Sequence, residues 1–172
     1  MNPLQLRRAH DLARVRDLCA RSGGQLQLLG ADGEAPSEIR LRLRARVALD
    51  AGYPRRAGSH VDLRVLIPAG YPLREPPRTV LSPVPWHPNV FADGTVCQGR
   101  GGQVSEFLDL YVQRIVRIAT YQPDVTNLGS VANPAAARWY AEACRRDPGA
   151  FPTDTVAAAA AGGAGIRWQD AG

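Results

Sequence analysis

Residues 71–97 read YPLREPPRTVLSPVPWHPNVFADGTVC, and this stretch constrains the fold more than any other part of the chain. Seven prolines lie from Pro68 up to Asn89, and each fixes its own φ and pushes the preceding residue towards extended backbone. The stretch ends in the tripeptide HPN, residues 87–89, and in Cys97, eight residues after Asn89. A prolyl turn with an Asn is common, so the tripeptide alone is a weak signal. Together, these features predict a rigid, irregular connection that leads to one cysteine.

Strand patterns precede this connection. Residues 39–49, IRLRLRARVAL, alternate apolar and charged side chains, which is the period-two pattern of a strand with one face in water. The four charged residues on that face are Arg40, Arg42, Arg44 and Arg46. Residues 25–29 and 60–67 predict two further strands, and residues 79–81 predict a short fourth one. Strands that follow one another after a helix indicate an α+β fold with a four-stranded antiparallel meander.

The chain is predicted to begin with a helix. Asn2 can cap it, with Pro3 at its first position, and an apolar stripe on one face indicates that the helix continues to about Arg21. Cys19 belongs to this stripe, so we expect a buried thiol there and exclude it from the site. Arginines on another face repeat every seven residues, which usually indicates a solvated surface.

Two more helices are predicted in the second half. The first opens at Val104 or Ser105 and runs through EFLDLYVQRIVRIATYQ, residues 106–122, whose apolar stripe should cross the sheet and fill the core. The second begins at Asn133 and Pro134, which form a helix start, and ends in basic residues.

The length of 172 residues fits one domain, and 45% hydrophobic with 22% charged residues is typical of a globular protein. We assign residues 1–150 to this domain and the Ala- and Gly-rich residues 151–172 to a C-terminal tail. The N-terminal segment lacks the apolar run of a signal peptide, and no window is apolar enough for a membrane span. A cytoplasmic location is therefore expected.

The net charge is +5, and every one of the 21 basic residues is arginine, because the chain contains no lysine. An acyl group on a cysteine would thus find only the N-terminal amine within its own chain. To explain the absence of lysine, we favour codon bias over selection against self-modification. The cysteines and histidines show neither a disulfide framework nor a metal-ligand spacing, so no metal and no cofactor are expected. These residues are Cys19, Cys97, Cys144, His10, His60 and His87.

A family resemblance rests on the residues quoted first. The motif YP-x-x-x-PP at residues 71–77, followed by WHPNVFADGTVC at residues 86–97, resembles the core of ubiquitin-conjugating enzymes. The segment ANPAAARWYAE, residues 132–142, is similar to the helix start that follows the crossover helix of that family. The resemblance implies the ubiquitin-conjugating fold, with an N-terminal helix, a meander sheet, a crossover helix and a C-terminal helix.

The resemblance also implies roles for single residues. Cys97 would be the nucleophile that carries a ubiquitin-like protein as a thioester and passes it to an amine. Asn89 would donate a hydrogen bond to the carbonyl oxygen during transfer, or its amide would hold the loop through backbone contacts, and both roles are compatible. His87 would brace the loop. The residue that gates the incoming lysine would fall at Ser130, with Asp124 and Asn127 as rivals.

The first helix of this family docks on the activating enzyme, which would give Arg7, Arg8 and Arg14 a role in binding. Other expected partners are the ubiquitin-like protein, a target protein and a deconjugating peptidase from the same gene neighbourhood, which in some prokaryotes is linked to defence against phage. No membrane partner is expected, and for the arginine face of residues 40–46 solvation is favoured over nucleic acid or a second ubiquitin-like protein. The sequence CQGRGGQVSEF, residues 97–107, departs from the family and suggests a flexible rim at residues 99–102.

Two alternatives remain open. A non-catalytic module of the same fold would bind ubiquitin-like proteins without carrying them, although inactive relatives typically lose the cysteine. A cysteine hydrolase would use Cys97 with His87 as its general base and would need no activating enzyme.

Overall fold

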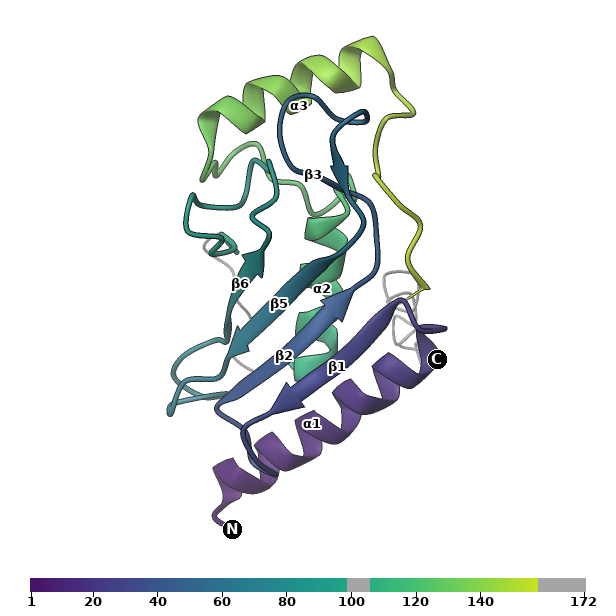
Figure 1. Ribbon diagram of the computed structural model, residues 1–172. Helices are drawn as coiled ribbons and strands as arrows, with labels where there is room; N and C mark the ends of the chain where they lie inside the picture. Colours follow the sequence, from purple (N-terminus) through teal and green to yellow (C-terminus); the bar gives the residue numbers. More distant parts are fainter. Residues whose placement is uncertain (99–105, 158–172) are drawn as a thin grey trace, which may run out of the picture.

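Figure 1 shows the computed structural model, which describes residues 1–98 and 106–157. The predicted α+β class is confirmed, with a helix at the N-terminus, a four-stranded antiparallel sheet and further helices. In chain order the elements are α1 (Pro3–Arg21), β1 (Leu26–Ala31), β2 (Glu38–Leu43), β3 (Val47–Ala48), β4 (Ala57–Gly58), β5 (Val61–Leu66), β6 (Arg78–Ser82), α2 (Leu108–Ala119) and α3 (Pro134–Arg146).

The main sheet is a meander with the strand order β1-β2-β5-β6, and each neighbouring pair is antiparallel. Leu41 on β2 lies opposite Leu28 on β1 and Leu63 on β5, and Leu63 lies opposite Leu81 on β6. Leu41, Leu63 and Leu81 are at most 1% exposed. These leucines share one buried core with Leu108, Val112 and Ile115 of α2, the helix that lies behind the sheet in Figure 1.

The strand predicted over residues 39–49 is shorter in the structure. β2 ends at Leu43, and Val47–Ala48 form β3, which pairs with β4 in a separate two-stranded sheet. The backbone between them is bound by distant residues, since Arg46 donates its N–H to Asp154 and its carbonyl accepts from the Thr153 hydroxyl. The alternating burial continues through this break, so the predicted side-chain pattern is right although the strand is not continuous.

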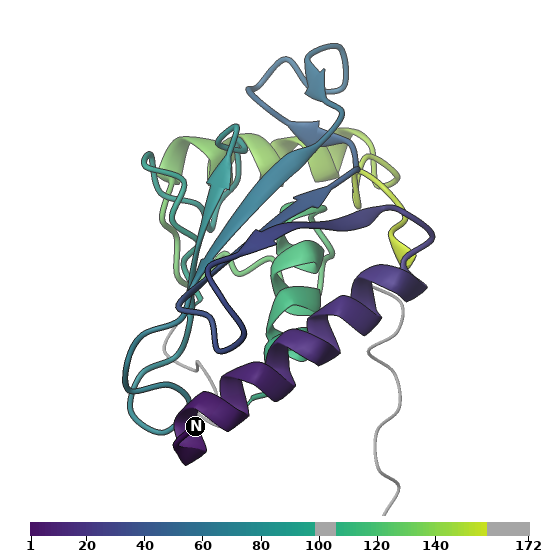
Figure 2. The ribbon, with the colours of Figure 1, turned by 60° about the horizontal axis from the view of Figure 1, so that its bottom comes forward.

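The two terminal helices of the domain begin where the sequence predicts. Asn2 and Gln5 form a reciprocal capping box at the start of α1, and the Asn133 side chain accepts a hydrogen bond from the Ala136 N–H at the start of α3. α1 runs beside β1 and packs against α2, whereas α3 lies at the end of the sheet near β3 (Figures 1 and 2).

The start of α2 differs from the prediction. Val104 and Ser105 lie outside the described residues, but Phe107 is not helical and α2 begins at Leu108. Phe107 has no side-chain capping bond, and the carboxylate of Asp11 on α1 accepts the Leu108 N–H at 3.3 Å instead. A capping residue that lies in another helix has no local sequence signature, which explains the error.

The structure describes the first residues of the segment that was assigned to the tail. Residues 151–157 pack on the domain: Val156 is 1% exposed within the main core, and Phe151 is 8% exposed within an aromatic cluster. The remaining residues of the predicted tail, 158–172, lie outside the described residues. Within residues 1–98 and 106–157, no helix has the length and apolar character needed to cross a membrane.

Candidate active site

Cys97 is held by backbone pairing with the HPN turn. Its N–H donates to the Asn89 carbonyl at 2.8 Å, and the preceding residue, Val96, bridges to Val90 and donates its N–H to the Thr79 carbonyl on β6. The site is thus built as a short extension beside β6, and the half-buried thiol follows immediately after it.

Gly94 makes the turn before the cysteine possible. Its φ is +84°, and a Cβ at this position would lie 2.4 Å from the Leu81 carbonyl oxygen. Both the left-handed backbone and the close approach to β6 require glycine.

His87 lies in the interior and accepts a hydrogen bond from within the HPN turn. Its side chain is 0% exposed, Nδ1 accepts the Asn89 N–H at 2.9 Å, and the ring contacts Tyr121 at a centroid distance of 4.2 Å. Burial lowers the pKa of His87 to about 3, against a smaller raising effect of the Ile118 carbonyl. Within the described residues Nε2 has no well-aligned hydrogen-bond partner. A neutral imidazole that faces the turn in this way is not placed to deprotonate Cys97.

The Asn89 side chain is 2% exposed in total and holds the loop that precedes α3. Its Nδ2 donates to the carbonyls of Asn127 at 2.7 Å and Ser130 at 3.0 Å, while its Oδ1 accepts the Asn127 N–H at 2.8 Å. The loop-holding role is therefore present in this structure. The oxyanion role remains a prediction, since the amide would have to release one of these carbonyls to perform it.

Ser130 is the gate candidate that the structure brings next to the thiol. Its Oγ lies 4.0 Å from Cys97 Sγ, and the serine is half-buried. The rival Asp124 forms an ion pair with Arg117, and the Asn127 side-chain oxygen accepts the Gly129 N–H. Of the three candidates, Ser130 is the one with a direct contact to the cysteine.

A groove of about 410 Å³ runs from Cys97 along the side of α2. Gln98 and Arg114 form one part of its wall, and the loop that ends α2 forms another, with Val125 and Leu128. The groove combines polar and apolar side chains, and Cys97 is part of its lining.

A polar cluster at the base of this groove has no signal in the sequence. Gln98 Nε2 donates to the Pro77 carbonyl at 2.8 Å and to the Tyr111 hydroxyl at 3.0 Å. Arg114 pairs with Glu106 at 2.7 Å and reaches Gln98 Oε1 at 3.4 Å. Gln98 and Glu106, the described residues on either side of residues 99–105, both contact Arg114 on α2. Residues 99–102, which were expected to form a flexible rim, lie outside the described residues.

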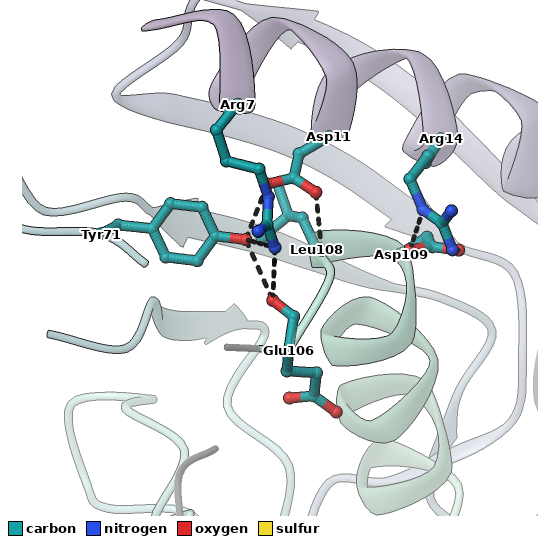
Figure 3. Close-up of polar contacts among 7 residues, drawn as sticks. All are labelled: Arg7, Asp11, Arg14, Tyr71, Glu106, Leu108 and Asp109. Carbon is teal, nitrogen blue, oxygen red and sulfur yellow. Dashed lines mark hydrogen bonds and ion pairs between the residues drawn. The ribbon is translucent and has the colours of Figure 1, made fainter. Parts of the chain in front are cut away.

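The arginines expected to dock the activating enzyme make internal contacts. Arg14 pairs bidentately with Asp109 on α2, at 2.8 and 3.0 Å, and Arg8 donates to the Pro68 carbonyl at 2.7 Å. Arg7 pairs with the buried Asp11 at 2.8 Å. Arg14 therefore joins α1 to the start of α2 (Figure 3), although its side chain remains 35% exposed.

Figure 3 also shows the polar network around Asp11. The Tyr71 hydroxyl donates to Asp11 at 2.7 Å and to the Glu106 carbonyl at 3.1 Å, and Arg7 donates to the same carbonyl at 3.1 Å. Tyr71, the first residue of the proline motif, is thus a buried link between α1 and the segment before α2. Burial, followed by the Asp11 contact, raises the pKa of the Tyr71 phenol well above its usual range, so the hydroxyl stays a donor.

The two other cysteines lie apart from this site. Cys19 on α1 packs against the main core, where burial raises the pKa of its thiol, against a smaller effect of the Leu28 backbone. Cys144 on α3 packs against the aromatic cluster. In residues 1–98 and 106–157, no group of three or more His, Cys, Asp or Glu side chains is placed to hold a metal ion.

Comparison with models of protein families found none that matches this chain, and a search of curated proteins found no match. A proposal for the function therefore depends on the chemistry and placement of these residues.

Proposed function

We propose that this chain is a carrier of the ubiquitin-conjugating type, with the corresponding fold. An activating enzyme passes a ubiquitin-like protein to Cys97 as a thioester, and the carrier then transfers it to an amine on a target protein. The observation that carries this proposal is the half-buried Cys97, held by its backbone 2.8 Å from the Asn89 carbonyl of the HPN turn, beside a groove of about 410 Å³.

Thioester exchange suits this environment. The attacking and leaving groups are both thiols, so the step needs an accessible sulfur and modest deprotonation rather than a strong base. The buried, neutral His87 supplies no base, and Ser130 is the only side chain that contacts Sγ through a polar atom within the described residues. A site of this composition exchanges acyl groups between thiols more readily than it activates water.

The cysteine hydrolase is less compatible with the site. A hydrolase of this kind needs an imidazole that takes the proton from the thiol. His87 instead accepts the Asn89 N–H and packs on Tyr121. A non-catalytic binding module remains the main alternative, and the hydrogen bond between Cys97 and the HPN turn together with the neighbouring groove favours the carrier.

The arginine face of residues 40–46 is better explained as a solvated surface than as a nucleic-acid-binding surface. On the sheet, Arg42 pairs with Asp62 at 2.7 Å, and Arg64 pairs with Glu38 at 2.9 Å. These carboxylates neutralise part of the positive charge that a polyanion would need. A cytoplasmic location, and a deconjugating peptidase that reverses the reaction, are further expectations of the proposed function.

The loading assay tests the proposal. The chain would be incubated with the ubiquitin-like protein and activating enzyme of its gene neighbourhood and with ATP, and then separated by electrophoresis without reducing agent. An adduct that forms on the wild type, disappears with thiol and is absent from Cys97→Ala is the expected result. If an activating enzyme that is itself charged yields no adduct, the binding module becomes the better account.

A further inference from the structure

We infer that the hydroxyl of Ser130 donates the hydrogen bond that stabilises the carbonyl oxygen during transfer from Cys97, and that Asn89 positions Ser130 rather than touching the reacting atoms. This inference rests on the proposed function and assigns a part of its chemistry differently from the family resemblance. The amine nitrogen attacks the thioester carbon, and the carbonyl oxygen becomes negative. When the C–N bond is complete, the C–S bond breaks, the thiolate of Cys97 leaves, and the ammonium proton passes to water. The oxygen that bears the transient charge is the atom that needs a donor.

The hydrogens of the Asn89 amide are already committed. An amide nitrogen carries two hydrogens. In Asn89, Nδ2 donates to the Asn127 carbonyl at 2.7 Å and to the Ser130 carbonyl at 3.0 Å, and Oδ1 accepts the Asn127 N–H at 2.8 Å. An Asn89 that turned towards the thioester would leave at least one of these partly buried carbonyls without its donor and would release the loop.

The same contacts place Ser130. Its carbonyl accepts a hydrogen bond from Asn89. Two and three residues later, the N–H groups of Ala132 and Asn133 both donate to the Pro88 carbonyl, at 2.8 and 3.0 Å. Ser130 is thus fixed against the HPN turn by these bonds. Because Cys97 is bound to the same turn, the thiol and the hydroxyl share one support.

The distance suits a donor to an acyl oxygen. Ser130 Oγ lies 4.0 Å from Cys97 Sγ, a long contact that leaves the hydroxyl hydrogen able to turn to a better acceptor. The oxygen of a thioester lies two bonds from the sulfur, so it can approach Oγ to the roughly 2.7–3.1 Å that an oxyanion donor requires.

Most side-chain donors that line the groove beside Cys97 are engaged elsewhere. Gln98 Nε2 donates to Pro77 and Tyr111, and the Thr126 hydroxyl donates to the Gln122 carbonyl at 3.0 Å. Arg114 is paired with Glu106. The exposed amide of Asn127 is the remaining candidate among the described groove residues, so Asn127→Ala serves as the comparison variant.

The test is a single-turnover discharge. Carrier loaded with the ubiquitin-like protein would be freed of ATP, mixed with a range of lysine concentrations, and followed by the loss of the thiol-sensitive adduct. Ser130→Ala should lower the limiting rate by on the order of 100-fold with little change in the lysine concentration at half-maximum. Ser130→Thr, which keeps the hydroxyl, should retain most of the rate, and Ser59→Ala, an exposed serine outside the site, should discharge as the wild type does.

A double-mutant cycle separates positioning from direct contact. If Asn89 acts through Ser130, adding Asn89→Ala to Ser130→Ala should slow discharge by less than threefold beyond Ser130→Ala alone. If the double variant instead slows discharge by the product of the two single effects, Asn89 itself contacts the reacting carbonyl oxygen, and the inference is overturned. A Ser130→Ala variant that discharges at the wild-type rate, or a loss of rate confined to Asn127→Ala, would also overturn it.

The failure of this inference is distinguishable from that of the proposed function. A wild type that loads normally while Ser130→Ala discharges normally would refute the role of Ser130 and leave the carrier intact. A wild type that never loads would remove both. Matching circular dichroism and thermal melting of every variant excludes unfolding as the cause of a slow rate.

Discussion

Replacing Asp11 with alanine should destabilise the fold by about 3–5 kcal/mol. The Asp11 side chain is 0% exposed, and it accepts hydrogen bonds from Tyr71 Oη at 2.7 Å, Arg7 Nε at 2.8 Å and the Leu108 N–H at 3.3 Å. These contacts join α1 to the proline-rich connection and to the first turn of α2 (Figure 3). Alanine would remove all three acceptor contacts at once.

The expected loss of stability in Asp11→Ala follows from the hydrogen-bond donors that lose their acceptor. Hydrogen bonds to a charged group contribute roughly 1.5–3 kcal/mol each, and a buried donor without a partner costs about as much again. Tyr71 is 1% exposed and would lose its shortest bond, whereas the Arg7 side chain, 22% exposed, can recover some hydration. These opposing effects keep the sum near 3–5 kcal/mol rather than higher. Asparagine keeps the size and one acceptor oxygen, so Asp11→Asn should cost about 2 kcal/mol.

Urea denaturation of the whole chain, followed by circular dichroism, measures this change. Asp17→Asn is the matched control because Asp17 is an exposed aspartate on the same helix, and it should change the free energy of unfolding by less than about 0.5 kcal/mol. An Asp11→Ala variant within about 1 kcal/mol of the wild type would show that the network contributes little to stability, and the reasoning would be refuted.

Three further predictions concern pH, backbone and charge. Burial lowers the pKa of His87 to about 3 in the folded chain, so below pH 6.5 the unfolded chain binds more protons than the folded chain. The free energy of unfolding should therefore fall by about 2 kcal/mol between pH 7 and pH 5. The variant His87→Asn should remove most of that fall. Gly94→Ala should cost about 3 kcal/mol in denaturation, since its Cβ would meet a carbonyl at 2.4 Å, whereas Gly23→Ala, at φ +63° in open space, should cost about 1 kcal/mol. Arg14→Asp should lower the melting temperature and slow loading, and Arg14→Asp with Asp109→Arg should restore the melting temperature by reversing the ion pair.

Each of these has a contradicting result. Equal pH slopes for the wild type and His87→Asn would show that the histidine is not held neutral. If Gly94→Ala and Gly23→Ala lower the free energy of unfolding by similar amounts, backbone strain at positive φ, and not the close approach of Gly94 to β6, sets the cost. For the charge swap, loading that recovers together with the melting temperature would give Arg14 a structural role only, while loading that stays slow in the stable double variant would support docking of the activating enzyme.

Features with local causes were predictable from the sequence. Asn2 and Pro3 predict the start of α1 because the cap and the helix are adjacent in the chain. The alternation of apolar and charged residues in β2 follows from the pleat of a strand, and it is confirmed. The spacing of eight residues between Asn89 and Cys97 identified this cysteine as the candidate, whereas its backbone pairing with the HPN turn is a finding of the structure.

Features with distant causes were not predictable. The sequence shows Asp11 as a carboxylate beside two arginines on a solvated stripe, yet its partner Tyr71 lies 60 positions away and removes it from water. The break after β2 depends on Asp154, which is 108 positions from Arg46. The Gln98 and Arg114 cluster likewise forms only when α2 packs behind the site.

The most direct measurement of the central claim is the intact mass of the loaded chain. Wild type treated with the ubiquitin-like protein, its activating enzyme and ATP should gain the mass of that protein less one water, and thiol should reverse the gain. Cys97→Ser should carry the same added mass, resistant to thiol and labile to base, because the ester then joins the serine oxygen. An added mass that survives on Cys97→Ala, or a wild type that gains no mass beside a charged activating enzyme, would contradict a thioester carrier at Cys97.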